Sequence, residues 1–298
     1  MRYQQSESRE PGAIAITWLT AALVATGIAL RVWQYLGRSA LWTDEATLAN
    51  NIVGRGLRTL LLEPLAHGQA APLGFLLIEK LAVRSFGANE LALRAFPLAC
   101  SIVALLLLWR VALWMLPRAV VPIVVAPFAL APPLIFFATD AKQYSGDMAV
   151  ALLLLLLALE LGTRELGARR AVVIAVSGAA VVWLSQPAVL VVAGLAAVLI
   201  ASALLAGEHR RAGALAAVTG VWALSALAVA GVSLARLEPG THRLMYTFWS
   251  DGFWPMSLVH GEGVWWPFQR TASLLSHQLA VPPLAGTIGT IVVLAGGI

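Results

Sequence analysis

Long runs of apolar residues dominate this chain, and most are about as long as a helix that crosses a lipid bilayer. About 20 consecutive apolar residues span a membrane as a helix. The 298 residues are 60% hydrophobic and only 12% charged, whereas soluble globular proteins carry about 25% charged residues. The shortfall excludes a soluble protein with a large core. It predicts an all-α polytopic membrane protein.

We expect about eight membrane-spanning helices within a single domain that covers residues 1–298. The predicted spans are residues 13–36, 95–116, 119–138, 148–161, 171–184, 188–206, 212–234 and 284–298. The first run is longer than the core of a signal peptide and lacks a cleavage site, so we interpret it as an uncleaved span. Near its end, Arg31 is expected to extend its side chain to the membrane interface. Prolines in the third run predict a kinked or broken helix; they are Pro122, Pro127, Pro132 and Pro133.

The positions of the arginines predict the orientation. Every second short loop is basic; these loops carry Arg118, then Arg164, Arg169 and Arg170, then Arg210 and Arg211. Positive residues favour cytoplasmic loops, so we expect a multi-pass protein of the cell membrane with a cytoplasmic N-terminus. Two large loops, residues 37–94 and 235–283, then lie on the extracytoplasmic face.

Composition also limits the partners and cofactors. The net charge of +5 is spread along the chain and is explained by topology, so we exclude nucleic acid as a partner. Cys100 is the only cysteine and lies in an apolar run. An internal disulfide is therefore excluded, and no Cys/His cluster has the spacing of a zinc site.

The first large loop is amphipathic rather than spanning. From Thr43 onward, apolar residues recur at helical spacing as far as Leu61, which predicts a helix lying in the membrane interface. A second helix is expected over Leu73–Phe86, which is too short and too charged for a comfortable span. Between them, His67 and Gln69 are interpreted as part of a turn.

Two adjacent acids, Asp44 and Glu45, stand where the chain leaves the first span. One interpretation is structural, because Thr43 as an N-cap followed by acids in the first turn suits a helix start. The other is functional, because two carboxylates at the membrane surface can act as a general base or hold a divalent cation. The two interpretations are compatible.

A polar segment on the same predicted face, residues 140–147, is the second candidate. It contains Asp140, Lys142 and Tyr144, and it is either an ordinary turn or a site for phosphate and sugar. Lys142 would supply a point charge to a phosphate, and Tyr144 a hydrogen-bond donor. Arg94, where the first loop re-enters the membrane, is an interfacial anchor or a further ligand.

These motifs together resemble the membrane glycosyltransferases of the GT-C fold, particularly the bacterial glycosyltransferase family 39 group. That group includes relatives of protein O-mannosyltransferases and lipid A aminoarabinose transferases. The resemblance covers residues 13–206. It rests on the order of a first span, Leu41-Trp42-Thr43-Asp44-Glu45-Ala46, Pro72-Leu73, Asn89-Glu90-Leu91-Ala92-Leu93-Arg94 and Asp140-Ala141-Lys142-Gln143-Tyr144.

The resemblance implies transfer of a sugar from a polyprenyl-phosphate donor to a lipid, glycan or protein acceptor. It places the catalytic acid on Asp44 with Glu45 beside it. It assigns donor-phosphate binding to Arg94, Asp140, Lys142 and Tyr144. The displacement is either metal-independent or assisted by Mg²⁺ or Mn²⁺, and Asp44 and Asp140 are then the expected ligands.

Three departures from the family pattern qualify this expectation. The stretch from His67 to Pro72 has one proline where the family often has two, so no direct role is assigned to His67. A lysine, Lys142, replaces the usual arginine. Family members usually have more spans after the second large loop, so we expect a C-terminally shortened form. The alternative functions are a transporter or flippase of lipid-linked substrates and a non-catalytic membrane subunit.

Overall fold

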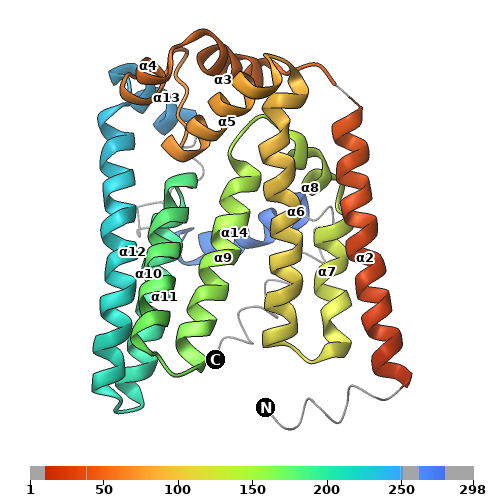
Figure 1. The fold of residues 1–298 in the computed structure, drawn as a ribbon, viewed down its shortest axis with the longest axis vertical. Helices are drawn as coiled ribbons and strands as arrows, with labels where there is room; N and C mark the ends of the chain where they lie inside the picture. Colours follow the sequence, from red (N-terminus) through yellow and green to blue (C-terminus); the bar gives the residue numbers. More distant parts are fainter. Residues whose placement is uncertain (1–10, 38, 249, 251–261, 279–298) are drawn as a thin grey trace.

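A bundle of long helices, capped at one end by short ones, forms the part of the chain that the structure describes (Figure 1). The structure is a computed structural model, and it describes residues 11–37, 39–248, 250 and 262–278. All regular elements in these ranges are helical. The long helices are α2 (Pro11–Leu36), α6 (Glu90–Met115), α9 (Tyr144–Thr163), α10 (Ala168–Val181), α11 (Ala188–Leu205) and α12 (His209–Ala235).

The prediction of a polytopic all-α membrane protein is confirmed in its coarse form. Within the described residues, five helices are long and apolar enough to cross a membrane, or six if one broken pair counts as a span. The predicted fifth span corresponds to α10, which has 14 residues and continues as a 3-10 turn, Val182–Leu184. The predicted eighth, residues 284–298, lies outside the described residues. Among the described residues, the structure therefore supports five or six of the predicted spans, and the count of eight stays a prediction.

The proline-rich third span is broken, as its sequence predicts. Helix α7 (Val121–Leu130) ends at Ala131, and α8 (Pro132–Phe136) continues into the 3-10 turn Phe137–Thr139. The two halves are bent by 59°. Proline has no backbone N–H, so Pro132 and Pro133 cannot donate to the carbonyls four residues earlier. The break thus leaves the carbonyls of Phe128 and Ala129 in need of donors.

Arg31 of α2 supplies those donors, which corrects the expectation that it reaches the interface. Its side chain is fully buried, and it donates to the carbonyl oxygens of Phe128 at 2.8 Å and Ala129 at 3.0 Å. It also donates to Ser101 Oγ on α6 at 2.8 Å. Its position near the end of the apolar run predicts a side chain at the interface. Inside the bundle, however, the carbonyl oxygens of the broken helix accept its hydrogen bonds and stabilise its charge.

Helices α10, α11 and α12 share one apolar cluster, within which α10 and α12 approach closely. On α10, a Cβ added to Gly178 would clash with the indole of Trp222 on α12. The Trp222 indole is fully buried there and donates to the Ile174 carbonyl at 3.1 Å. A small residue at position 178 therefore allows the two helices to approach.

Short helices of the first large loop form a cap over one end of the bundle (Figure 1). They are α3 (Thr43–Gly54), α4 (Leu57–Leu62) and α5 (Leu73–Phe86). Both predicted amphipathic stretches are helical, although the first is interrupted at Arg55 and Gly56. The N-cap of α3 is Trp42 rather than Thr43, because the backbone N–H of Trp42 donates to the side chain of Glu45.

The second predicted large loop is partly described. It contains α13 (Pro239–Phe248) and α14 (Glu262–Gln278), and residues 249, 251–261 and 279–283 lie outside the described part. Arg236, at the end of α12, donates to the carbonyl oxygens of Leu60 at 2.7 Å and Glu63 at 3.2 Å. These bonds connect the end of α12 to the cap.

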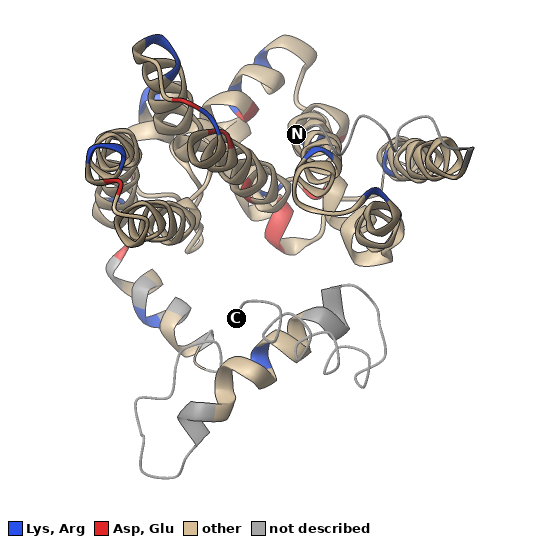
Figure 2. Cartoon of the chain, turned by 90° about the horizontal axis from the view of Figure 1, so that it is seen from below, with Lys and Arg blue, Asp and Glu red and all other residues tan. Residues whose placement is uncertain are grey.

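The two ends of the bundle differ in charge as the loop pattern predicts. The arginines of the short loops lie at the end where α2 begins, and Figure 2 views the molecule from that end. The cap and the polar segment before α9 lie at the opposite end. The two candidate motifs therefore share one end of the molecule, and the orientation of that end in a cell stays a prediction.

Candidate active site

Three separate parts of the chain meet beneath the cap. Asp44 and Glu45 lie in the first turn of α3, Gln69 lies between α4 and α5, and the turn Asp140–Gln143 precedes α9. An apolar cluster holds them in place; its members include Leu48, Ile52, Leu60, Phe75, Leu76, Leu93 and Ala141. Because Ala141 packs in this cluster, the acid and the lysine on either side of it have fixed positions.

Glu45 forms a buried ion pair with Arg94 of α6. The guanidinium donates to both carboxylate oxygens, with distances of 3.0 and 2.8 Å from one nitrogen and 3.1 Å from Nε. The backbone N–H groups of Ala141 and Trp42 donate to the same carboxylate at 2.7 and 3.1 Å. The Glu45 carboxylate therefore connects α3, α6 and the turn before α9.

These bonds determine the protonation of Glu45. Burial by itself would raise the pKa of this carboxyl, but the hydrogen bonds from Arg94, Ala141 and Trp42 outweigh it and lower the pKa. Glu45 is thus an ionised structural anchor in this arrangement. Its predicted catalytic role is not tested by the geometry, yet a carboxylate with this many donors has little freedom to accept a proton.

All three nitrogens of the Arg94 guanidinium donate hydrogen bonds. Besides Glu45, its guanidinium donates to the Ser39 carbonyl at 2.6 Å, to Ser39 Oγ at 3.1 Å and to the Ala40 carbonyl at 3.4 Å. The residue is 4% exposed. Donor-phosphate binding by Arg94 stays a prediction. The contacts support another task for it, which is to fix the chain between α2 and α3.

Asp44, Gln69 and Lys142 form a closed triangle. Lys142 Nζ lies 2.8 Å from Asp44 Oδ2 and donates to Gln69 Oε1 at 2.6 Å. Gln69 Nε2 in turn donates to Asp44 Oδ1 at 3.0 Å. The lysine side chain is 6% exposed, whereas that of Asp44 is 33% exposed. The acid is therefore the accessible member of the pair and the lysine the anchored one.

Asp140, two residues before Lys142, is buried and only partly hydrogen-bonded. Trp42 Nε1 donates to Asp140 Oδ1 at 3.2 Å, and the buried Oδ2 has no hydrogen-bond partner among the described residues. Burial, with the nearby charge of Glu45 acting in the same direction, raises the pKa of Asp140 to about 7. Asp140 can therefore exist in either protonation state near neutral pH.

The remaining predicted residues lie at the margin of this cluster. Tyr144, the first residue of α9, is 39% exposed, and its ring meets that of Phe137 edge-on at 5.6 Å. His67 is exposed and has a positive φ of 63° beside Gly68 at 65°, which agrees with its interpretation as a turn residue. The triangle thus comprises Asp44, Lys142 and Gln69, with Asp140 alongside.

Both predicted cation ligands, Asp44 and Asp140, have protein partners in the structure. Lys142 pairs with Asp44, and the Trp42 indole donates to Asp140. Among the described residues, no three His, Cys, Asp or Glu side chains come together as metal ligands. A cation between the two acids stays a prediction, and no step below passes through it.

Two members of the site, Gln69 and Trp42, are not among the site residues that the sequence predicts. The sequence indicates a turn at Gln69 and no role for Trp42. A weak sequence signal for Gln69 is that it closely precedes Pro72 in the family-like motif. A weak signal for Trp42 is that it closely precedes the two acids. Neither signal specifies a partner, since each contact joins residues that are 25 or more positions apart.

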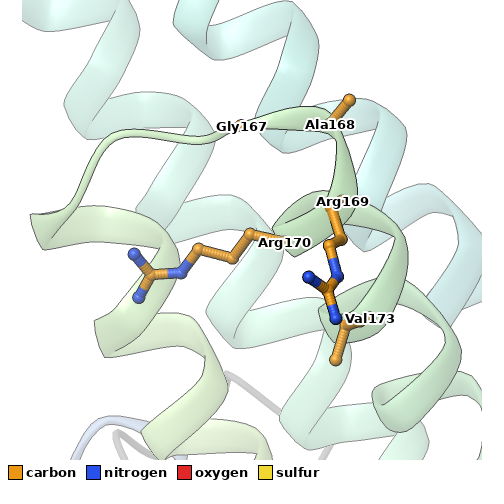
Figure 3. A pocket seen from close by; sticks show the side chains of 5 residues that line it. All are labelled: Gly167, Ala168, Arg169, Arg170 and Val173. Atoms are coloured by element: carbon orange, nitrogen blue, oxygen red, sulfur yellow. The ribbon is translucent and has the colours of Figure 1, made fainter.

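A separate hollow lies at the opposite end of the bundle. Its volume is about 620 Å³, and it is lined by Gly167, Ala168, Arg169, Arg170 and Val173 (Figure 3). Figure 3 shows Arg169 lying beside Val173, while Arg170 extends away toward the neighbouring helix. There Arg170 pairs with Glu160 of α9. This hollow belongs to the arginine-rich end and not to the acidic site.

No protein-family model, curated protein or solved structure matches this chain. The resemblance to glycosyltransferases therefore stays a prediction. The chemistry has to be inferred from the site itself.

Proposed function

We propose that this protein transfers a sugar from a polyprenyl-phosphate donor to an acceptor on the extracytoplasmic face of the cell membrane. The observation that carries the proposal is the pairing of Asp44 with Lys142 at 2.8 Å, at the capped end of a membrane-spanning bundle. A cation for the phosphate and a base for the acceptor are then adjacent. The polyprenyl chain would remain in the bilayer while its phosphate and sugar reach this end.

The proposed reaction is a direct displacement at the anomeric carbon. Asp44 accepts the proton of the acceptor hydroxyl or amine as the acceptor atom bonds to the anomeric carbon. The bond from that carbon to the phosphate oxygen breaks, and polyprenyl phosphate leaves with the electron pair. Lys142 stabilises the negative charge that the phosphate gains.

The other polar residues have supporting tasks in this proposal. Glu45 and Arg94 hold α3 and the turn before α9 together, so that Asp44 and Lys142 face each other. In this proposal, Asp140 and Tyr144 contact the sugar or phosphate; of the two, Tyr144 is the exposed one. The identities of the sugar and the acceptor would depend on surfaces beyond these contacts.

The decisive experiment is sugar transfer by purified Asp44→Asn protein from a radiolabelled polyprenyl-phosphate sugar. General-base catalysis contributes typically 10²–10⁴-fold, so we expect a loss of about that size without a loss of folding. The exposed acid Glu63 lies in the same loop, and Glu63→Gln serves as the matched control. Transfer by Asp44→Asn at the wild-type rate would exclude Asp44 as the base.

The alternative of a transporter or flippase draws on the 59° break between α7 and α8, because broken helices often line transport sites. However, Arg31 already satisfies the carbonyls exposed at that break. Reconstituted protein distinguishes the two functions, since a flippase would move a fluorescent polyprenyl-phosphate lipid between leaflets without forming a new glycosidic product.

A further inference from the structure

The closed triangle of Asp44, Gln69 and Lys142 poses a chemical problem for the proposed function, on which this inference rests. Asp44 cannot act freely as a base while one oxygen pairs with Lys142 and the other accepts from Gln69. Lys142 likewise has two of its three N–H groups directed at these partners. The resting site therefore keeps its base and its phosphate ligand bound to each other.

We propose that the donor phosphate displaces Asp44 from Lys142, and that Gln69 is the positioning residue that retains Asp44 after the exchange. Binding of the phosphate then releases the base, so that Asp44 becomes active only when a phosphate occupies the site. The same step replaces one anionic partner of Lys142 by another, so the lysine charge stays paired throughout.

The exposures of the two side chains indicate which one moves. Lys142 is 6% exposed and follows Ala141, which is buried in the apolar cluster of the cap. Asp44 is 33% exposed, in the first turn of α3. An incoming phosphate can therefore reach the pair from the Asp44 side, and the aspartate can rotate away while the lysine stays fixed.

Gln69 is suited to hold the released aspartate because its side-chain oxygen and nitrogen bind different partners. Its Oε1 accepts from Lys142 at 2.6 Å, and its Nε2 donates to Asp44 at 3.0 Å. When the phosphate takes over the ion pair, the Nε2 contact is still available to orient the carboxylate toward the acceptor. A neutral amide does this without adding a negative charge that would repel the phosphate.

Binding of polyprenyl phosphate without a sugar tests the exchange directly. We would measure its affinity for wild-type protein, Asp44→Asn and Lys142→Met in nanodiscs. The neutral asparagine competes less strongly for Lys142 than the carboxylate does, so we expect Asp44→Asn to bind about three- to tenfold more tightly than wild type while losing transfer. Lys142→Met should lose most of the binding. Asp44→Ser, which also lacks the charge, provides a second variant if the first folds poorly.

Gln69→Met tests the positioning role, because it keeps the length of the side chain and removes both hydrogen bonds. We expect kcat to fall by about 10- to 100-fold, as for a group that orients a catalytic side chain, with the KM for donor changed less than about threefold. A purely structural residue would change folding or KM instead. Unchanged kcat in folded Gln69→Met protein would exclude this role.

Glu63→Gln is the matched control for charge, because it removes one negative charge from the same loop and its side chain forms no ion pair with any described residue. A similar gain in affinity for Glu63→Gln would show that the effect is general electrostatics and would overturn the exchange. Equal or weaker binding by Asp44→Asn would overturn it as well. If wild-type protein binds no polyprenyl phosphate, the proposed function itself is wrong.

Discussion

At the scale of single residues, Glu79 has a buried carboxyl group that lacks hydrogen-bond partners among the described residues. It lies on α5, and both of its carboxyl oxygens are buried. Burial raises the pKa of Glu79 to about 9. The carboxyl group is therefore uncharged at neutral pH, and the folded protein bears the cost of keeping it protonated.

Replacing Glu79 by glutamine is expected to stabilise the protein in a pH-dependent way. The folded pKa of about 9 exceeds the ordinary value of 4.5, so between these pH values the folded state holds a proton that the unfolded state releases. The free energy of unfolding of the wild type should consequently decrease as pH rises through this window. Relative to Glu79→Gln, the loss from pH 5 to pH 8 should be about 2–4 kcal/mol.

Thermal unfolding in detergent at pH 5 and pH 8 checks this expectation. Glu79→Gln should exceed the wild-type melting temperature at pH 8 by several degrees and approach it at pH 5. The exposed acid in the control Glu63→Gln should produce no such divergence. Identical pH dependence in the wild type and Glu79→Gln would show that Glu79 is charged or solvated in the folded protein.

At the scale of elements, the broken span between α7 and α8 depends on a residue far away in the sequence. The N–H groups missing from Pro132 and Pro133 are replaced by donors of Arg31, about 100 residues earlier. A carbonyl left without a donor inside the bundle costs about 1–3 kcal/mol. The arginine is therefore a structural part of the break and not an anchor at the membrane surface.

Arg31→Met should destabilise the bundle strongly, because it leaves the carbonyls of Phe128 and Ala129 unsatisfied. We expect the apparent melting temperature in detergent to fall by more than about 5 °C. Arg31→Lys should be intermediate, since an ammonium cannot reproduce the planar fork of donors. Arg110→Met, which removes an exposed arginine from α6, should change it little. Equal effects at positions 31 and 110 would contradict the role assigned to Arg31.

Elements were more predictable from the sequence than their contacts. Hydrophobic periodicity located both amphipathic stretches of the first loop, and the prolines predicted the break after Leu130. Partners were not predictable in this way. Glu45 and Arg94 are 49 positions apart, and only the packing of α3 against α5 and α6 makes them a buried pair. The expected position of the Arg31 side chain is wrong for the same reason. The distance of Arg31 from the end of an apolar run does not reveal the break between α7 and α8 beside it.

At the scale of the whole molecule, the distribution of charge distinguishes the two ends of the bundle. Arginines gather where α2 begins, at the loops before α7, α10 and α12. The Asp44–Lys142 pair and its supporting contacts lie at the other end, under the cap. A donor held by its lipid chain in the bilayer can reach a site at one end only. The proposed reaction therefore requires the capped end to face away from the cytoplasm.

Cysteine labelling of intact cells tests this orientation. The native Cys100 is buried, and Cys100→Ala provides a background without a thiol. In that background, Arg58→Cys places a thiol on the exposed surface of the cap, and Arg169→Cys places one at the arginine-rich end. A membrane-impermeant maleimide should label position 58 in intact cells and position 169 only after permeabilisation, because the positive-inside rule puts the arginines in the cytoplasm. The reverse pattern would place Asp44 in the cytoplasm and exclude a donor presented on the outer face.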